Sequence, residues 1–237
     1  MREVYATDAA ARQHPQLIAS AKTSDARVVE MSEAVARAMS QTETPQGLIA
    51  VCGLHAQPWS VEAAAGLLAP QSSDAAVEAA VRTVVVLDRI SDPGNAGTII
   101  RSADAAGGVA VVFTSGSVDP HNGKCVRATA GSLFHLPVLT DASVTDVLAL
   151  AREHGAHCLA ADGRAAMNLD DPTVRQMLRG LLVWVFGSEA HGVSEEARAA
   201  VDASVSIPIL GRAESLNLAA AAAVCLYAPL LTTPPTP

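Results

Sequence analysis

The sequence has 237 residues, of which 50% are hydrophobic and 3% are aromatic, and its formal net charge is −8. Such a chain can bury a sizeable core of aliphatic side chains, which excludes wholesale disorder. The longest unbroken apolar run, Leu218 to Leu231, is shorter than the roughly 20 residues of a membrane span, and no secretory signal pattern is present. We therefore expect a cytoplasmic protein of one or two domains without a membrane partner. The acidic total argues against a nucleic-acid binder that works through bulk positive charge.

Hydrophobic periodicity alternates between strand and helix patterns along the chain. The first part predicts a small α/β domain, with strands near 4–5, 28–29 and 48–51 and helices over 9–21 and 32–39. A turn-forming stretch over 69–74 is the best linker, so we expect domains 1–75 and 76–237. In the second part, β-branched runs predict strands over 84–87, 109–113, 158–160 and 181–186, and helix patterns cover 98–106, 143–153, 194–200 and 215–227. This alternation predicts an α/β fold whose parallel sheet is covered by helices on both faces.

The cysteines and histidines give no sign of a disulfide framework or a metal site. The four cysteines are Cys52, Cys125, Cys158 and Cys225. They form no CxxC pair, as is typical of reduced, buried thiols in a cytosolic protein. His154 and His157 form an HxxH pair without an acidic or thiol ligand spaced beside them, so no metal is expected.

A polar, glycine-containing segment follows the strand expected at 84–87 and extends to Arg101. Segments in this position present ligands in α/β folds. Gly94 and Gly97 permit bends or a close approach to a ligand, and the amide of Asn95 can both donate and accept. The dinucleotide fingerprint and the P-loop pattern are both absent, which disfavours a dinucleotide-dependent oxidoreductase. An ordinary glycine turn beside a surface arginine explains this segment equally well.

Two further segments follow later strand patterns. Gly187 to Glu189 leave the strand expected at 181–186, although a glutamate between glycines is commonly a solvated loop residue. Ile207 to Asn217 precedes an alanine-rich helix with a flat surface suited to packing against a helix or a subunit. Ser215 could cap that helix, whereas Asn217 would gain little structurally inside the first turn of an apolar helix.

Together these segments resemble, in order, the three signature motifs of the SpoU (TrmH) family of RNA 2′-O-ribose methyltransferases. The residues that carry the resemblance are Asn95 to Arg101, Gly187 to Glu189, and Ile207–Pro208 through Ser215 to Asn217. The stretch Lys124 to Ser132 is also similar to that family, and the likeness covers about residues 80 to 230. The resemblance implies a SPOUT catalytic domain with S-adenosylmethionine as methyl donor, a deep trefoil knot, and homodimerisation through the knot region.

The resemblance also implies roles for individual residues. It implies cofactor binding by Gly187, Ile207 and Leu216, with Thr114, Ser188 and Leu210 nearby. It implies catalysis by Arg101, with the arginine and the ribose oriented by Asn95, Glu189, Ser215 and Asn217. Because a guanidinium has a pKa above about 12, Arg101 is a poor base and could instead hold the target phosphate and stabilise the forming alkoxide. From the partner subunit, Lys124 and Arg127 would reach the RNA.

The substrate is expected to be RNA, with large-subunit ribosomal RNA first. The front domain is similar to a small ribosomal-protein-like domain of that family, best at Thr42 to Gly47, and such domains accompany large-subunit RNA modifiers. It lacks the strand and helix that usually come first, so we expect an N-terminally incomplete or reduced RNA-binding domain. A transfer-RNA or antibiotic-resistance methyltransferase stays open, as does a non-catalytic cofactor- or RNA-binding protein. Residues Pro120 to His135 contain Lys124 and Arg127 but no acid, so a few cations could bind RNA despite the net charge.

Overall fold

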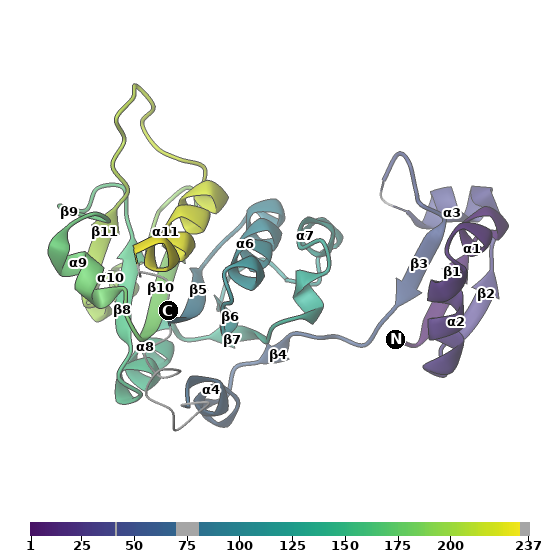
Figure 1. Ribbon diagram of the computed structural model, residues 1–237, viewed down its shortest axis with the longest axis horizontal. Coiled ribbons are helices and arrows are strands. Elements are labelled where there is room, and N and C mark those ends of the chain that lie inside the picture. The colour runs from purple at the N-terminus through teal and green to yellow at the C-terminus, as the bar shows by residue number, and fades with distance from the viewer. Residues whose placement is uncertain (41, 70–80, 233–237) are drawn as a thin grey trace. The chain divides into compact units, whose positions relative to one another are not determined.

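The computed structural model describes residues 1–40, 42–69 and 81–232, and the chain forms two compact units, Met1–Leu54 and His55–Pro237 (Figure 1). The boundary expected near residue 75 lies outside the described residues. The two units divide earlier because β4 (Gln57–Pro58) pairs with a strand of the second unit and α4 (Val61–Leu68) packs on its sheet.

The first unit contains a three-stranded sheet of order β2-β1-β3, in which β1 pairs with β2 in parallel and with β3 antiparallel. Its elements are β1 (Glu3–Ala6), α1 (Asp8–Gln13), α2 (Pro15–Thr23), β2 (Arg27–Glu30), α3 (Glu33–Met39) and β3 (Leu48–Val51). The single helix expected over 9–21 is two helices, because Pro15 begins α2 and lacks the backbone N–H that would continue α1.

The second unit is built on an eight-stranded sheet of order β4-β7-β6-β5-β10-β8-β11-β9, in which every neighbouring pair is parallel. Its further strands are β5 (Arg82–Asp88), β6 (Ala110–Thr114), β7 (Val138–Ala142), β8 (His157–Ala161), β9 (Met167–Asn168), β10 (Leu181–Gly187) and β11 (Ala203–Ser206). Its further helices are α6 (Pro93–Ala105), α7 (Gly123–Ala128), the 3₁₀ helix η1 (Ser132–Phe134), α8 (Val144–Glu153), α9 (Pro172–Met177), α10 (Glu195–Ala200) and α11 (Leu218–Thr232). The predicted α/β fold with a large parallel sheet is therefore confirmed.

Helices cover both faces of this sheet, and the alternation of side chains along each strand separates two cores. Along β10, Trp184 and Phe186 face the core that contains α6, α7, α9 and α11. Val183 and Val185 face the opposite core, which contains α4, α8 and α10. Among the described helices, none is long and apolar enough to cross a membrane.

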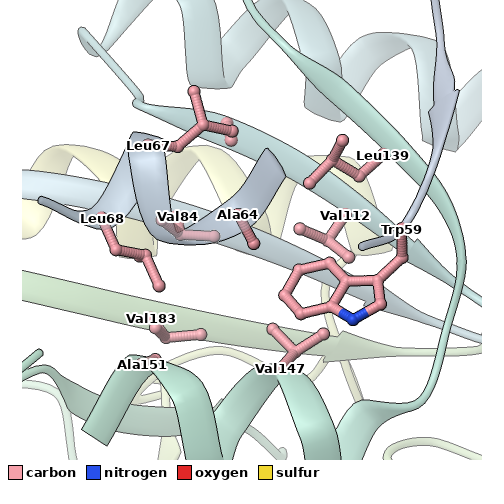
Figure 2. A pocket seen from close by; sticks show the side chains of 11 residues that line it. Trp59, Ala64, Leu67, Leu68, Val84, Val112, Leu139, Val147, Ala151 and Val183 are labelled. Atoms are coloured by element: carbon pink, nitrogen blue, oxygen red, sulfur yellow. The ribbon is translucent and has the colours of Figure 1, made fainter. Parts of the chain in front are cut away.

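The small cavity beneath α4 belongs to the second of these cores. Figure 2 shows Leu68 of α4 and Val147 of α8 on either side of Val183 of β10. The space between them is about 10 Å³ and is lined by apolar side chains, with Trp59 at one end. A water needs at least about 10–15 Å³ and several polar partners. This cavity is therefore part of the hydrophobic packing and offers no room for a ligand.

The strand order reverses at β5. From β5 the chain adds β6 and then β7 on one side of β5. It then forms β8 to β11 on the other side, where the order outward from β5 is β10, β8, β11, β9. The ends of β5 and β10 lie side by side, with Gly187 in register with Asp88. Ligands bind at such a topological switch point, beyond the carboxyl ends of the strands. The three segments singled out in the sequence follow β5, β10 and β11 and meet at this edge.

Candidate active site

The first segment is the start of a helix. The Asp92 carboxylate accepts a hydrogen bond from the backbone N–H of Asn95 at 2.8 Å, and Pro93 occupies the first helical position. A capping aspartate followed by proline is a strong helix-starting signal. The helix expected from residue 98 therefore begins at Pro93, and residues 93–97 form the first turn of α6 instead of a loop.

A chain of side-chain hydrogen bonds joins the three segments. Asn95 Nδ2 donates to Glu189 Oε1 at 2.8 Å, and Asn95 Oδ1 accepts from Asn217 Nδ2 at 3.1 Å. Asn217 Oδ1 accepts in turn from the backbone N–H groups of Ala219 and Ala220. Because each amide has distinct donor and acceptor ends, this pattern fixes the orientation of both asparagines. We refer to Asn95, Glu189 and Asn217 as the Asn–Glu–Asn cluster.

Ser91 is a member of the site that the sequence reading missed. Its Oγ donates to Glu189 Oε2 at 3.3 Å, so both carboxylate oxygens of Glu189 have a donor. The only sequence signal was a hydroxyl residue in the segment after β5, which by itself singles out no role.

The third segment differs from expectation at the start of α11. The helix begins at Leu218 and not near residue 215. Asn217 is therefore the residue that caps it, a structural role that the sequence reading gave to Ser215. Ser215 is exposed and lines the cavity described below.

Arg101 lies apart from the Asn–Glu–Asn cluster. It is six residues after Asn95 in α6, which at 1.5 Å per residue places it about 9 Å farther along the helix axis. Its side chain is exposed and makes no hydrogen bond or ion pair with any residue that the structure describes. Within the described residues, no hydrogen bond therefore joins Arg101 to Asn95, Glu189, Ser215 or Asn217, the residues expected to orient it.

A cavity of about 400 Å³ opens beside the cluster, between the segments that follow β8, β10 and β11 and the start of α11. Four of the six residues expected at the cofactor line it: Gly187, Ser188, Ile207 and Leu216. Glu189, Ser215 and Asn217 also line it, so one wall is shared with the polar cluster. Asp162 and Gly163 complete the lining after β8, a segment in which the sequence showed no motif.

Thr114 and Leu210 lie outside this lining. Thr114 is buried at the end of β6, where its Oγ1 accepts from the backbone N–H of Arg89 at 2.9 Å and donates to Asp88 Oδ1 at 3.3 Å. Asp88 Oδ2 accepts from the backbone N–H of Ser194 at 2.8 Å. Thr114 thus helps to join the ends of β5 and β6 to the start of α10. Leu210 is 98% exposed in the segment between β11 and α11.

The turn after β10 requires glycine at position 187. A Cβ atom there would lie 2.0 Å from the carbonyl carbon of Gly192, which folds back over it. The backbone of Ser188 pairs with that of Gly192 in both directions, at 3.1 and 2.8 Å. This tight turn presents Glu189 to both the cluster and the cavity.

The two residues expected to contact RNA lie on α7, which packs beside α6 (Figure 1). Lys124 Nζ is 2.6 Å from Asp92 Oδ2, and this hydrogen bond, together with the N–H of Asn95, lowers the pKa of Asp92. Arg127 is exposed in the last turn of α7. Lys124 is therefore tied to the cap of the helix that carries Asn95.

Comparison with protein families matches residues 82–227 to the SpoU rRNA Methylase family. The chain belongs to this family. The matched residues include all three segments and the whole Asn–Glu–Asn cluster.

Individual SpoU relatives extend the match beyond the catalytic part. The chain is 34% identical over 197 residues to the 23S rRNA (guanosine(2553)-2′-O)-methyltransferase RlmP of Bacillus subtilis, covering 83% of this chain and 70% of RlmP. The AdoMet-bound rRNA methyltransferase of Sinorhizobium meliloti superposes with a TM-score of 0.74 at 29% identity, covering 96% of this chain and 78% of that one. The SpoU methyltransferase AviRb of Streptomyces viridochromogenes, also solved with AdoMet, gives 0.73 at 26% identity, covering 97% and 82%.

The cavity beside the Asn–Glu–Asn cluster fits S-adenosylmethionine in size and chemistry. Its volume is within the roughly 300–1,000 Å³ of small-molecule sites. Ile207, Leu216 and Leu218 supply apolar surface for a base, and the carboxylates of Asp162, Glu189 and Glu214 suit a positively charged ligand. Within the described part of the chain, no group of three side chains could hold a metal ion.

Proposed function

We propose that this chain methylates a ribose 2′-hydroxyl of large-subunit ribosomal RNA at the rim of the cavity, beside the Asn–Glu–Asn cluster. The cluster is the observation that carries the proposal, because it brings one residue from each of the three segments to one edge of the sheet. Family membership confirms the enzyme class, an RNA 2′-O-ribose methyltransferase, and its donor, S-adenosylmethionine. The ribosomal substrate is favoured because RlmP and the Sinorhizobium meliloti enzyme are both named rRNA methyltransferases.

The cavity residues bind and orient the donor in this proposal. Bound S-adenosylmethionine would supply an electrophilic methyl group on a sulfonium centre. Gly187, Ile207 and Leu216 provide backbone groups and close packing, and Glu189 and Asp162 make the cavity electrostatically suited to a cation. Because Glu189 is shared with the cluster, donor and ribose would be positioned by one connected set of hydrogen bonds.

Arg101 is the residue that we propose acts on the substrate. Its guanidinium stays charged at neutral pH, so it would hold a phosphate of the target nucleotide and stabilise negative charge as the 2′-oxygen loses its proton. Its exposed position on α6, away from the cluster, leaves it available to RNA.

We further propose that two copies pair through α11, with the chain threaded as a trefoil knot. The exposed apolar side chains Val224, Tyr227 and Leu231 recur at three- and four-residue spacing along α11, which carries no charge in its first or last turn. Tyr227 Oη donates to the backbone oxygen of Ala105 at 3.3 Å, so this face is continuous with α6. A homodimer through it would bring Arg101 close to the partner subunit, as the family resemblance implies.

Transfer RNA as substrate, or a resistance methylation of ribosomal RNA, are alternatives within the same chemistry. We propose that the first unit contacts RNA and that the enzyme works in the cytoplasm. A protein that binds cofactor or RNA without catalysis is the alternative of a different class, and it predicts no methyl transfer.

The test is transfer of radiolabelled methyl from S-adenosylmethionine to purified ribosomal and transfer RNA, followed by mapping of alkali-resistant 2′-O-methyl sites. We expect label in large-subunit RNA. Arg101→Ala should lower the rate by at least about 100-fold while changing cofactor affinity by less than about threefold in calorimetry. Arg175→Ala, which removes an exposed arginine of α9, is the matched control. Cofactor binding without label in either RNA would contradict the proposal, and a parallel loss of cofactor affinity in Arg101→Ala would contradict the role of Arg101.

A further inference from the structure

A stretch without acidic residues, Pro120 to His135, lies along α6 and is held near both ends of that helix. At one end, Lys124 Nζ contacts Asp92 Oδ2 at 2.6 Å, just before α6 begins. At the other end, His135 Nδ1 lies 2.7 Å from Asp104 Oδ2, one residue before α6 ends. The 13 residues of α6 span about 20 Å. We call this stretch the α7–η1 strip; it leads from the catalytic edge of the sheet toward the opposite edge.

The far end of the strip presents an aromatic side chain to solvent. Phe134 is 51% exposed, whereas the other two phenylalanines, Phe113 and Phe186, are buried in the core. The ring of His55 meets Phe134 edge-on, with 5.7 Å between the ring centroids. The position of His55 is itself fixed, because its backbone N–H donates to His121 Nε2 of the strip at 3.2 Å.

A cavity of about 430 Å³ adjoins this aromatic pair. Polar, aromatic and proline groups line one part of it, and aliphatic side chains line the rest: His55, Gln57, Phe134, His135 and Pro137, with Ala63, Leu67, Leu136, Val138 and Leu139. It lies at the start of β7, whereas the catalytic cavity lies beyond the ends of β8, β10 and β11, so the two are separate. A half-exposed aromatic ring beside amide and imidazole groups matches the side chains that hold unpaired nucleobases.

We propose that Phe134 and His55 form a stacking site for a nucleobase of the RNA substrate, outside the methylated nucleotide, and that the intervening backbone follows the strip past Lys124 and Arg127. This inference rests on the proposed RNA methyltransferase function and adds a residue pair to it. RNA is the favoured occupant because the strip combines cations with an exposed aromatic ring and carries no carboxylate to repel phosphate. The neighbouring carboxylates of Asp92, Asp104 and Asp119 are each paired with a side chain of the strip, namely Lys124, His135 and His121.

The experiment uses the full chain and fluorescein-labelled 12-nucleotide oligoadenylate and oligouridylate in anisotropy titrations at low salt. Base–aromatic stacking is worth about 1–3 kcal/mol per base, so Phe134→Ala should weaken binding by roughly 5- to 150-fold. Phe134→Trp should restore it, and oligoadenylate should lose more than oligouridylate because purines stack more extensively. A 2-aminopurine placed in the oligoadenylate should be quenched by the native protein and by Phe134→Trp, and not by Phe134→Ala.

Two controls separate stacking from folding and from subunit pairing. The cofactor affinity in calorimetry and the mass in light scattering should be unchanged in Phe134→Ala, because the side chain is half exposed. Unchanged RNA affinity in Phe134→Ala would overturn the stacking inference. It would not count against the proposed methyltransferase function. A change of oligomeric state in this variant would also overturn it and would place Phe134 in a subunit interface. Failure of the native protein to methylate any RNA is the separate outcome that counts against the proposed function.

Discussion

Asn95 Nδ2 donates a 2.8 Å hydrogen bond to Glu189 Oε1 and thereby joins the first turn of α6 to the turn after β10. The two residues are 94 positions apart in the chain, yet they lie at adjacent strand ends because β10 inserts next to β5 in the sheet. Glu189 is thus a positioning group as well as a wall of the cavity. Its charge and its hydrogen-bonding geometry can be separated by substitution.

Glu189→Gln and Glu189→Ala should differ widely in methyl transfer. Gln keeps an oxygen that can accept from Asn95, so the cluster can persist, and we expect the rate to fall by less than about tenfold. Ala removes the acceptor and leaves the Asn95 amide without its partner, so we expect a loss of about 100-fold or more. Single-turnover rates with saturating cofactor measure both. Equal, severe losses in the two variants would show instead that the negative charge itself is essential.

Gly187→Ala should disrupt the turn after β10. The added Cβ would lie 2.0 Å from the Gly192 carbonyl carbon, a backbone atom that cannot move without opening the turn. We expect a loss of unfolding free energy of about 3 kcal/mol, together with weakened cofactor binding. The measurement is chemical denaturation followed by fluorescence, since both tryptophans, Trp59 and Trp184, lie in the second unit.

Gly163→Ala is the matched control for that substitution. Gly163 lines the same cavity, but a Cβ there meets no atom within 4 Å and its backbone is not in the left-handed region. We expect a change in unfolding free energy within about 0.5 kcal/mol. Equal destabilisation by the two alanines would contradict the tight turn at Gly187.

The sequence predicted the alternating architecture and most of the strands because hydrophobic runs of β-branched residues report burial directly. It missed β4, β7, β9, β11, α4, α7 and α9, which are short and, apart from the apolar α4, mixed in polarity. It also placed the start of α6 five residues late by treating Gly94 and Gly97 as loop residues. Gly97 is instead a helical glycine that allows close packing, since a Cβ there would lie 2.3 Å from the Cys125 backbone oxygen.

The residues of the candidate site were predictable in part, since Ser91, Asp162 and Gly163 were missed, and their arrangement was not predictable. Asn95, Glu189 and Asn217 come from segments whose proximity depends on strand order, which periodicity does not determine. The polar residue at 217 looked unexplained because α11 was expected to start at 215. The placement of Arg101 away from the cluster follows because α6 already begins at Pro93, a start that Gly94 and Gly97 concealed.

Asp92 links stability to pH. Its pKa is lowered in the folded protein, first by the hydrogen bond from Lys124 and then by the Asn95 N–H. A depressed carboxylate pKa gives stability that is present above the unfolded value, near pH 4, and is lost as pH falls through the folded value. Asp92→Asn, which keeps a capping oxygen, should cost up to about 1 kcal/mol at pH 7 because the Lys124 pair is partly exposed.

The difference between native protein and Asp92→Asn should shrink as pH falls below about 4 toward the lowered pKa of the folded protein, because the native carboxyl becomes protonated over that range. Denaturant midpoints of both proteins from pH 7 to pH 3 provide the measurement. Asp92→Ala should lose about 1 kcal/mol more than Asp92→Asn at every pH, because the helix cap is then missing. A difference between native and Asp92→Asn that stays constant down to pH 3 would rule out the Lys124–Asp92 pair as its source.

Thiol reactivity tests the packing of the helices that build the site. Burial raises the pKa of Cys125 to about 11 and those of Cys158 and Cys225 to about 12, whereas Cys52 is exposed. At pH 8 the buried groups are then about 0.1% thiolate or less, and access is blocked as well.

A disulfide-exchange reagent at pH 8 should therefore modify about one thiol rapidly in the native protein and the other three only after unfolding. Cys52→Ser should abolish the rapid phase, and peptide mapping should identify the site. Rapid modification of Cys225 in native protein would be the most damaging result. Cys225 faces the core from α11, so its exposure would mean that this helix does not pack as described. The wall of the cofactor cavity and the proposed subunit interface would then both lose their support, because α11 contributes Leu218 to the one and Tyr227 to the other.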